Sequence, residues 1–199
     1  MSRLCIIPAR GGSRRIKHKN IRMFYGKPII WYSIATAKRT GMFDRIIVST
    51  DDDIVAEIAH KGGAEIHRRS EADSRDEVGT QTVICHVVQH YATTEEYRPD
   101  FVCGIYATCP MLTVGDLHDG FDLLWRKKAS FTFSVGTEPL ADAGMFYWGT
   151  ATAFAYGEPL ISPNTVMVPI PSNRVCDIND ERDWIRAEAM YDNLHREKA

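Results

Sequence analysis

Short apolar runs and amphipathic stretches alternate along this chain. Residues 4–9 form an apolar run that is too short for a helix and ends in turn residues, so a buried strand is predicted there. Residues 28–39 carry apolar positions at helical spacing, with proline in the expected first turn and Gly41 just past the end. The same two patterns recur to the end of the chain. The other predicted strands are 45–50, 64–67, 101–106, 130–135, 145–148 and 165–168, and the other predicted helices are 53–61, 80–92, 116–127, 150–156 and 181–198.

The alternation of strands and helices indicates the fold class. A strand-helix-strand succession favours a mostly parallel sheet with helices on both faces. The chain has 199 residues and a hydrophobic content of 44%, which suits one domain built around one good core. The sequence therefore predicts a single α/β domain over residues 1–199, a three-layer α/β/α, Rossmann-like architecture.

The first predicted strand runs directly into a glycine pair surrounded by cations. Gly11 and Gly12 allow backbone angles that point successive N–H groups into one concavity, which suits phosphate oxygens. Ligands of open α/β sheets bind at the carboxyl ends of strands, where this loop begins. The alternative is a solvated basic surface loop. The cations of the loop are Arg10, Arg14, Arg15, Lys17 and Lys19.

The loop differs from the two commonest phosphate-binding motifs. It contains neither G-x-G-x-x-G nor G-x-x-x-x-G-K-[ST]. A hydride-transfer enzyme and an ordinary kinase are therefore poorly supported. The best interpretation from the residues is a polyphosphate site of another class.

Two acidic clusters follow predicted strands or precede predicted helices. If the segment near the C-terminus is extended, Asp177 and Asn179 point the same way and offer two hard oxygen ligands suited to Mg²⁺. Helix capping by Asn179 or Asp180 explains that cluster too, and capping is the simpler explanation for the acids at 51–53. A cationic phosphate loop combined with a carboxylate metal site is the equipment of a nucleotidyl transfer.

Composition excludes several partners. The net charge of −2 provides no bulk attraction to nucleic acid or to an anionic membrane, and no apolar stretch approaches a membrane span or a signal peptide. A cytoplasmic protein is expected, in which cysteines are reduced. His86 and His90 lie four residues apart on a predicted helix but lack a third ligand nearby, so a polar helix face is favoured over a metal site. The cysteines are Cys5, Cys85, Cys103, Cys109 and Cys176.

Several segments resemble the hallmark segments of the sugar-acid cytidylyltransferases, the family of the CMP-sialic acid synthetases. They are residues 7–13 (IPARGGS), the pair at 19–20 (KN) and residues 47–51 (IVSTD). Residues 106–110, 142–149 and 174–179 look most similar to the pseudaminic acid branch of that family. The resemblance covers nearly the whole chain in order.

This resemblance implies a nucleotidyltransferase fold and activity. The expected reaction joins CTP to a nonulosonic acid, a nine-carbon sugar acid, and yields the CMP-sugar and pyrophosphate for surface glycan or flagellin glycosylation. Pseudaminic acid is the expected substrate and Mg²⁺ the expected cofactor. By the same resemblance, the nucleotide-binding residues are Arg10, Gly11, Gly12, Ser13, Arg14, Lys19, Asn20, Arg69 and Thr80.

The resemblance also implies residues for the sugar, the metal and the chemistry. Tyr106 stands where sialic acid synthetases commonly have a glutamine that faces the sugar. No histidine stands out as a general base, so activation of the sugar hydroxyl is assigned to the metal. The expected sugar-binding residues are Tyr106, Asp142 and Tyr147, the metal-binding residues Asp177 and Asn179, and the catalytic residues Arg10, Lys19 and Asp177.

Three departures from the family pattern qualify this expectation. Asn179 stands in place of the second metal-binding acid, and an uncharged amide should hold Mg²⁺ more weakly. Met145 and Cys109 replace a glutamine and an alanine expected in the pseudaminic acid branch. Only residues 136–139 remain where the family carries a longer arm that covers the sugar site and helps form the homodimer. The arm is thus shortened or missing, and a monomer is possible here.

Two alternatives stay open on the sequence alone. The substrate could be sialic acid, legionaminic acid or another sugar acid such as a deoxyoctulosonate. Alternatively, the protein could be a catalytically weakened nucleotide-binding module, because Asn179 replaces an acid and the arm is short.

Overall fold

A mixed sheet runs through the part of the chain that the computed structural model describes, residues 1–196. Its strands are β1 (Arg3–Pro8), β4 (Arg45–Thr50), β5 (Glu65–Arg68), β6 (Phe101–Ile105), β7 (Phe131–Thr137), β8 (Leu140–Thr150) and β9 (Thr165–Ile170). They lie in the order β5-β4-β1-β6-β8-β7-β9. β8 is antiparallel to both of its neighbours, and all other pairs are parallel. The prediction of a mostly parallel sheet is confirmed.

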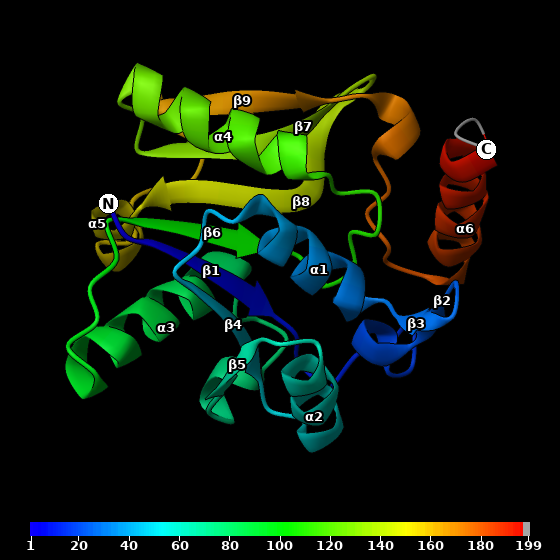
Figure 1. Cartoon of the computed structure of the whole chain (residues 1–199), viewed down its shortest axis with the longest axis horizontal. Helices are drawn as coiled ribbons and strands as arrows, with labels where there is room; N and C mark the ends of the chain where they lie inside the picture. Colours follow the sequence, from blue (N-terminus) through cyan, green and yellow to red (C-terminus); the bar gives the residue numbers. More distant parts are fainter. Residues whose placement is uncertain (197–199) are drawn as a thin grey trace.

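Helices cover both faces of this sheet, as Figure 1 shows. They are α1 (Ile30–Thr40), α2 (Asp53–Lys61), α3 (Thr80–Thr94), α4 (Val114–Lys127), α5 (Ala151–Ala155) and α6 (Glu181–Arg196). α1, α2 and α4 bury their apolar sides in one core cluster, and α3 and α5 bury theirs in a second cluster. β1 contributes to both, since Cys5 and Ile7 face the first cluster while Leu4 and Ile6 face the second. None of the described helices has the length and apolar character needed to cross a bilayer.

Five short elements complete the described chain. A two-stranded hairpin, β2 (Met23–Phe24) and β3 (Lys27–Pro28), follows the 3₁₀ turn η1 (Lys19–Ile21). Two further 3₁₀ turns are η2 (Ala72–Ser74) and η3 (Ser172–Arg174). The hairpin and η1 bring the loop after β1 toward the C-terminal helix α6 (Figure 1).

Two of the predicted elements differ from the structure. Pro28 was expected in the first turn of a helix, but it pairs with Met23 in the small hairpin, and α1 begins two residues later. The predicted strand at 145–148 is the inner part of the longer β8, whose outer half pairs with β7 across a tight turn at Glu138 and Pro139. The expected end of the last helix at Lys198 lies outside the described residues.

Aromatic packing attaches α6 to the hairpin. Phe24 packs edge-on against Trp184 and Tyr191, with ring centroids 5.6 and 5.3 Å apart. Arg22 adds an ion pair with Glu181 at 2.6 Å. Edge-to-face pairs of this kind stabilise by about 1 kcal/mol beyond their burial. These contacts place the segment that precedes α6 beside the loop that follows β1.

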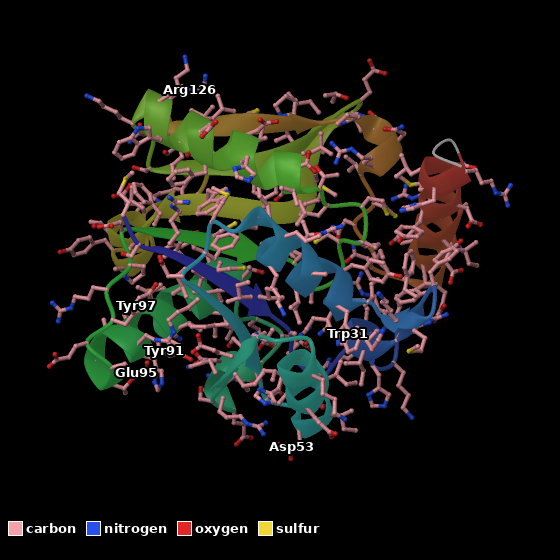
Figure 2. The ribbon with its side chains drawn as sticks, in the orientation of Figure 1. Trp31, Asp53, Tyr91, Glu95, Tyr97 and Arg126 are labelled. Carbon is pink, nitrogen blue, oxygen red and sulfur yellow. The ribbon has the colours of Figure 1, made fainter. Side chains whose placement is uncertain are left out.

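A cation–π cluster stabilises the edge of the sheet formed by β4 and β5. The Arg45 guanidinium lies 4.4 Å from the ring centroid of Tyr91 and 5.1 Å from that of Tyr97. Arg45 also forms ion pairs with Glu65 and with Glu95, the latter at 2.7 Å. Figure 2 shows Tyr91, Glu95 and Tyr97 together at the end of α3. The cluster holds α3 against β4 and β5, the strands that carry part of the site described below.

Candidate functional site

The loop after β1 lies against the start of α2. The Gly11 N–H donates to Asp51 Oδ1 at 2.9 Å, so this carboxylate occupies one of the two N–H groups expected to face phosphate. The Asp52 carboxylate accepts from the backbone N–H groups of Ile54 and Val55, which confirms helix capping as the role of that acid. A Cβ on Gly11 would lie 2.5 Å from Asp52 Oδ2. Glycine is therefore required at position 11 by close packing.

The packing of Gly11 predicts a difference between the two glycines. Gly11→Ala should lower the free energy of unfolding by about 1–3 kcal/mol, because its methyl group overlaps Asp52 and forces the loop or the helix cap to move. Gly12→Ala is the matched control, since a Cβ at Gly12 meets nothing within 4 Å. Urea denaturation of both variants measures the difference. Equal losses of stability would contradict this account of the loop.

Two of the predicted phosphate-binding cations share one acidic partner. Arg10 forms an ion pair with Asp76, and Arg14 Nη2 lies 2.8 Å from Asp76 Oδ2. Arg14 is 84% exposed, whereas Arg10 is 34% exposed and faces a cavity. The solvated-loop interpretation thus applies to Arg14 but not to Arg10. Sequence reasoning missed Asp76, because a carboxylate in an irregular segment carries no periodic signal.

Lys19 and Asn20 fold back onto neighbouring backbone. Lys19 Nζ donates to the carbonyl oxygen of Ile178 at 2.6 Å, and Asn20 Nδ2 donates to the carbonyl oxygen of Arg10 at 2.9 Å. Burial lowers the pKa of Lys19, and the nearby Asp177 carboxylate opposes that shift. The phosphate loop and the C-terminal acidic segment are therefore parts of one site.

Asp177 and Asn179 lie on the same side of their segment. Asn179 Nδ2 donates to Asp177 Oδ2 at 2.6 Å, and Asn179 Oδ1 accepts from Arg15 Nη2 at 3.1 Å. The amide oxygen predicted as a metal ligand thus faces a guanidinium in this structure. Within residues 1–196, no group of three or more His, Cys, Asp or Glu side chains is arranged to hold a metal ion. Asp177 and Asn179 supply two hard oxygen ligands, which suits Mg²⁺ only when substrate phosphates complete the shell.

Asp180 has a capping role. Its Oδ1 accepts from the backbone N–H groups of Arg182 and Asp183, at 2.8 and 3.1 Å. Asp183 in turn accepts from the backbone N–H groups of Asn179 and Asp180 at 2.9 and 3.2 Å. Of the two capping residues considered for this cluster, Asp180 caps α6, and the Asn179 side chain remains directed at Asp177.

One cavity of about 180 Å³ gathers most of the predicted nucleotide-binding side chains. It lies between the loop after β1, the β5–α3 connection and the segment after β6. Gly11, Gly12 and Arg14 are the predicted residues that do not line it. Val78 and Val83 carry no motif signal in the sequence, whereas Pro8, Ala107 and Thr108 lie within the segments that resemble the family. The lining residues are Pro8, Arg10, Ser13, Lys19, Asn20, Arg69, Val78, Thr80, Val83, Tyr106, Ala107 and Thr108.

Arg69 is the buried cation of this cavity, only 9% exposed. Its Nη2 donates to the carbonyl oxygen of Ser49 at 2.9 Å. Burial lowers the pKa of Arg69, and the carboxylates of Asp51 and Asp73 oppose that shift. A guanidinium buried at this depth and held by a strand carbonyl is a fixed donor for a polar ligand.

The three predicted sugar-binding residues form one hydrogen-bonded chain. The Tyr106 and Tyr147 hydroxyls lie 3.1 Å apart, and the Tyr147 hydroxyl donates to Asp142 Oδ2 at 2.5 Å. Burial and these two partners raise the pKa of Tyr147. Tyr147 is buried, whereas Asp142 is exposed and Tyr106 lines the cavity. These hydrogen bonds therefore extend from the cavity to the surface.

Cys109 and Met145 lie beneath this chain rather than in the cavity. Both are almost fully buried, and Cys109 Sγ lies 2.8 Å from the carbonyl oxygen of Tyr106. Burial raises the pKa of the Cys109 thiol to about 12. Their effect on a ligand is thus indirect, through the position of Tyr106. All five cysteines are free, as predicted, although Cys85 is only half-buried.

A larger groove of about 810 Å³ lies elsewhere, between α1 and α6. Trp31, Arg39, Met111 and Tyr191 are among its lining residues, and Trp31 is labelled on α1 in Figure 2. No predicted site residue lines this groove. The smaller cavity, with its convergent cations and polar groups, is the better candidate site.

Comparison with known proteins agrees with that choice. Residues 4–138 match the family model described as cytidylyltransferase. The chain belongs to the cytidylyltransferase family. This cytidylyltransferase is 30% identical to the pseudaminic acid cytidylyltransferase of Campylobacter jejuni, over 98% of each chain. That alignment spans 228 positions, so the relative carries residues that this 199-residue cytidylyltransferase lacks.

Solved structures share the fold of this cytidylyltransferase. A CMP:2-keto-3-deoxy-manno-octonic acid synthetase complexed with CTP superposes with a TM-score of 0.79 at 13% identity, covering 98% of this chain and all of that one. A Mycobacterium tuberculosis protein in complex with manganese superposes with a TM-score of 0.68 at 10% identity, over 95% and 99% of the two chains. At these identities the comparison establishes the Rossmann-like α/β fold. The predicted enzyme class, a cytidylyltransferase, is confirmed by the family match.

Proposed function

We propose that this enzyme transfers the CMP group of CTP to a nine-carbon sugar acid, with pseudaminic acid as the preferred substrate. The observation that carries the proposal is the convergence of Arg10, Ser13, Lys19, Asn20, Arg69 and Thr80 on one cavity. The full-length similarity to the Campylobacter jejuni pseudaminic acid cytidylyltransferase supports the choice of sugar.

In the proposed reaction, the anomeric hydroxyl oxygen of the sugar attacks the α-phosphorus of CTP. The bond from that phosphorus to the oxygen bridging the β-phosphate breaks, pyrophosphate leaves with the electron pair, and the hydroxyl proton passes to solvent. Arg10 and Lys19 neutralise the charge that collects on the phosphate oxygens, which is the main demand of phosphoryl transfer. Ser13, which also lines the cavity, adds a neutral donor.

Other residues of the site are proposed to orient the remaining parts of the substrates. Asn20, Arg69 and Thr80 are proposed to hold the cytidine, since their side chains offer both donors and acceptors to the cavity. Tyr106, Tyr147 and Asp142 are proposed to hold the sugar hydroxyls. Because Tyr147 already donates to Asp142, the Tyr106 hydroxyl donates to Tyr147, which leaves the Tyr106 oxygen available to accept from a sugar hydroxyl.

Asp177 and Asn179 are the residues that would hold a divalent metal, with Mg²⁺ as the proposed ion. When bound together with nucleotide phosphates, such an ion neutralises charge on the phosphates and lowers the pKa of a coordinated hydroxyl. The bond from Arg15 to Asn179 Oδ1 must then open, because that oxygen is the proposed ligand. Manganese in a Mycobacterium tuberculosis protein of the same fold supports a divalent ion in this architecture.

The substrate is tested by measuring pyrophosphate release with CTP and a panel of sugar acids. We expect turnover with pseudaminic acid to exceed turnover with legionaminic acid, sialic acid and a deoxyoctulosonate by at least about tenfold in kcat/KM, a difference that a few hydrogen bonds can supply. Turnover with sialic acid and none with pseudaminic acid would exclude the proposed sugar while retaining the reaction.

A second candidate function is a nucleotide-binding module with weakened catalysis. The observation that favours it is the contact between Asn179 and Asp177, in which an amide occupies the place of an acid. This candidate predicts CTP binding that depends little on Mg²⁺ and no pyrophosphate even at high enzyme concentration. The expected cytoplasmic location, the role in surface glycan or flagellin glycosylation and the monomeric state permitted by the short turn at Glu138 remain predictions.

A further inference from the structure

Ser49 and His67 are direct neighbours on adjacent strands. In the parallel pair β4 and β5, Ser49 lies opposite His67, so both side chains point to the same face of the sheet. Ser49 is fully buried and His67 is 8% exposed. Ser49 Oγ lies 3.1 Å from His67 Nδ1. A polar pair at this depth is retained only when each member is satisfied.

Arg69 follows His67 by two residues and returns to the same serine. The Arg69 backbone N–H donates to the carbonyl oxygen of Thr50 at 2.9 Å. Its guanidinium donates through Nη2 to Ser49 O at 2.9 Å and approaches Ser49 Oγ with Nε at 3.4 Å. Ser49 thus contacts both His67 and Arg69 and links the histidine to the arginine that lines the cavity.

The chemistry of the three groups sets the direction of this chain. A guanidinium can only donate, so Ser49 Oγ accepts from Arg69, and its hydroxyl hydrogen remains available to donate to His67 Nδ1. In that arrangement His67 accepts at Nδ1 and carries its proton on Nε2. Burial lowers the pKa of His67 to about 4, and the facing His90 and Arg69 act in the same direction. The imidazole is therefore neutral at physiological pH, as the chain requires.

The surroundings of His67 keep it away from substrate. Its ring packs edge-on against His90 of α3, with centroids 4.8 Å apart, and lies at 6.2 Å from Tyr91. The other nearby titratable pair is His86 and Asp73, with His86 Nδ1 2.7 Å from Asp73 Oδ1, and the Asp73 carboxylate opposes the lowering of the His67 pKa. His67 does not line the nucleotide cavity, whereas Arg69 does. Any effect of His67 on a ligand must pass through Ser49 and Arg69.

We propose that Ser49 and His67 are positioning residues that set the orientation of the Arg69 guanidinium for the nucleotide. This inference rests on the proposed function, which places cytidine beside Arg69. The two bonds to Ser49 use Nη2 and Nε of the guanidinium, and its other N–H groups have no acceptor among the described residues. Those groups are the donors available to a ligand, and their direction is fixed by the contact with Ser49.

Paired substitutions at His67 test the position of the accepting atom. His67→Asn keeps a polar atom near the place of Nδ1, whereas His67→Gln moves it to the place of Nε2. We expect His67→Gln and Ser49→Ala to raise the Kd and KM for CTP about tenfold, the loss of one hydrogen bond to a charged group. The kcat value and the KM for the sugar should stay within about twofold. His67→Asn should recover most of the CTP affinity, and His86→Asn, outside the chain, should leave it unchanged.

A double-mutant cycle separates positioning from general loss of structure. In an Arg69→Ala background, His67→Gln should have no further effect on CTP affinity, because the residue through which it acts is gone. An equal effect in both backgrounds, or equal loss in His67→Asn and His67→Gln, would overturn the inference.

A spectroscopic measurement tests the chain independently of activity. In ¹⁵N–¹H spectra of the wild-type protein, His67 should show an unprotonated Nδ1 and a protonated Nε2 at neutral pH. A proton on Nδ1 would overturn the inference even if the enzyme were active. Conversely, wild-type enzyme that releases no pyrophosphate from CTP would contradict the proposed function. The tautomer of His67 would then still decide whether His67, Ser49 and Arg69 form the inferred hydrogen-bonded chain.

Discussion

Lys19→Ala should lower kcat/KM for CTP by about 10²–10³, the range seen when one preorganised donor to a developing oxyanion is removed. Lys19 is half-buried at the cavity, and its ammonium lies 2.6 Å from the carbonyl oxygen of Ile178 and close to Asp177. Because the position is partly shielded from solvent, neither water nor a mobile cation replaces the lost charge. Pyrophosphate release at saturating sugar measures the loss.

Lys17→Ala is the matched control for that experiment. Lys17 lies on the same loop but is exposed, and it does not line the cavity. Its removal should change kcat/KM by no more than about twofold, since an exposed charge is screened by solvent and salt. Equal losses in the two variants would mean that the loop attracts nucleotide by bulk charge, and that Lys19 has no specific place in the reaction.

Asp177→Asn should lower kcat about 100-fold and weaken the dependence of the rate on Mg²⁺. Removing the charge of a ligand weakens the binding of a hard cation, and the chemistry that the cation supplies is lost with it. Asp177 is the one carboxylate of the proposed metal pair, so its loss leaves only amide oxygens. The substitution keeps the size of the side chain, which matters because the backbone of Gly144 lies close by. A Cβ added to Gly144 would lie 3.2 Å from Asp177 Cγ. Rates measured across a series of Mg²⁺ concentrations check the result.

Asn179→Asp is the opposing variant. It places a second carboxylate beside Asp177 and should lower the Mg²⁺ concentration for half-maximal rate about tenfold. It also replaces the amide donor that now reaches Asp177 at 2.6 Å with a like charge, so the gain should appear only when the ion is present. Unchanged Mg²⁺ dependence in both variants would favour the nucleotide-binding module over the enzyme mechanism.

The parts of the site that could be predicted from sequence are local ones. Gly11 and Gly12 follow an apolar run of strand length, and both the strand and the turn are visible in adjacent residues. The parallel pairing of β1 with β4 then brings Asp51 to Gly11, which follows from topology once both strands are recognised. The close packing of Gly11 against Asp52 could not be predicted, because the spacing of residues in a sequence does not determine how closely two loops approach each other.

The long-range contacts of the site could not be predicted in the same way. Asp76 is one of several acids in an irregular segment, and only the folded chain shows that it meets Arg10 and Arg14. The pairing of Ser49 with His67 depends on strand register, and a shift of one residue would turn the side chains to opposite faces. Family resemblance pointed to seven of the residues that line the cavity, among them Arg10, Arg69 and Tyr106, but not to the hydrogen bonds between them and their neighbours.

Two errors in the predicted elements have a common cause. Proline suits the first turn of a helix and the end of a short strand equally well, so Pro28 did not reveal the hairpin β2–β3. In β8, Gly144 has a positive φ of 60° and Asp142 is exposed, which interrupts the alternation that marks a strand. Antiparallel pairing with β7 extends the strand through this interruption. In both places a tertiary contact decided between local options of similar energy.

Under the proposed function, nucleotide affinity is a difference between two states, because Arg10 and Arg14 already form ion pairs with Asp76. A triphosphate that enters the cavity exchanges with a resident counterion belonging to the protein itself. Under the proposed function, Asp76 holds the two guanidinium groups near each other before the substrate arrives, and opening these ion pairs lowers the affinity for the substrate. Under the proposed function, the Asp76 carboxylate pairs with both arginines again when pyrophosphate leaves, so a residue of the β5–α3 connection assists release of the product.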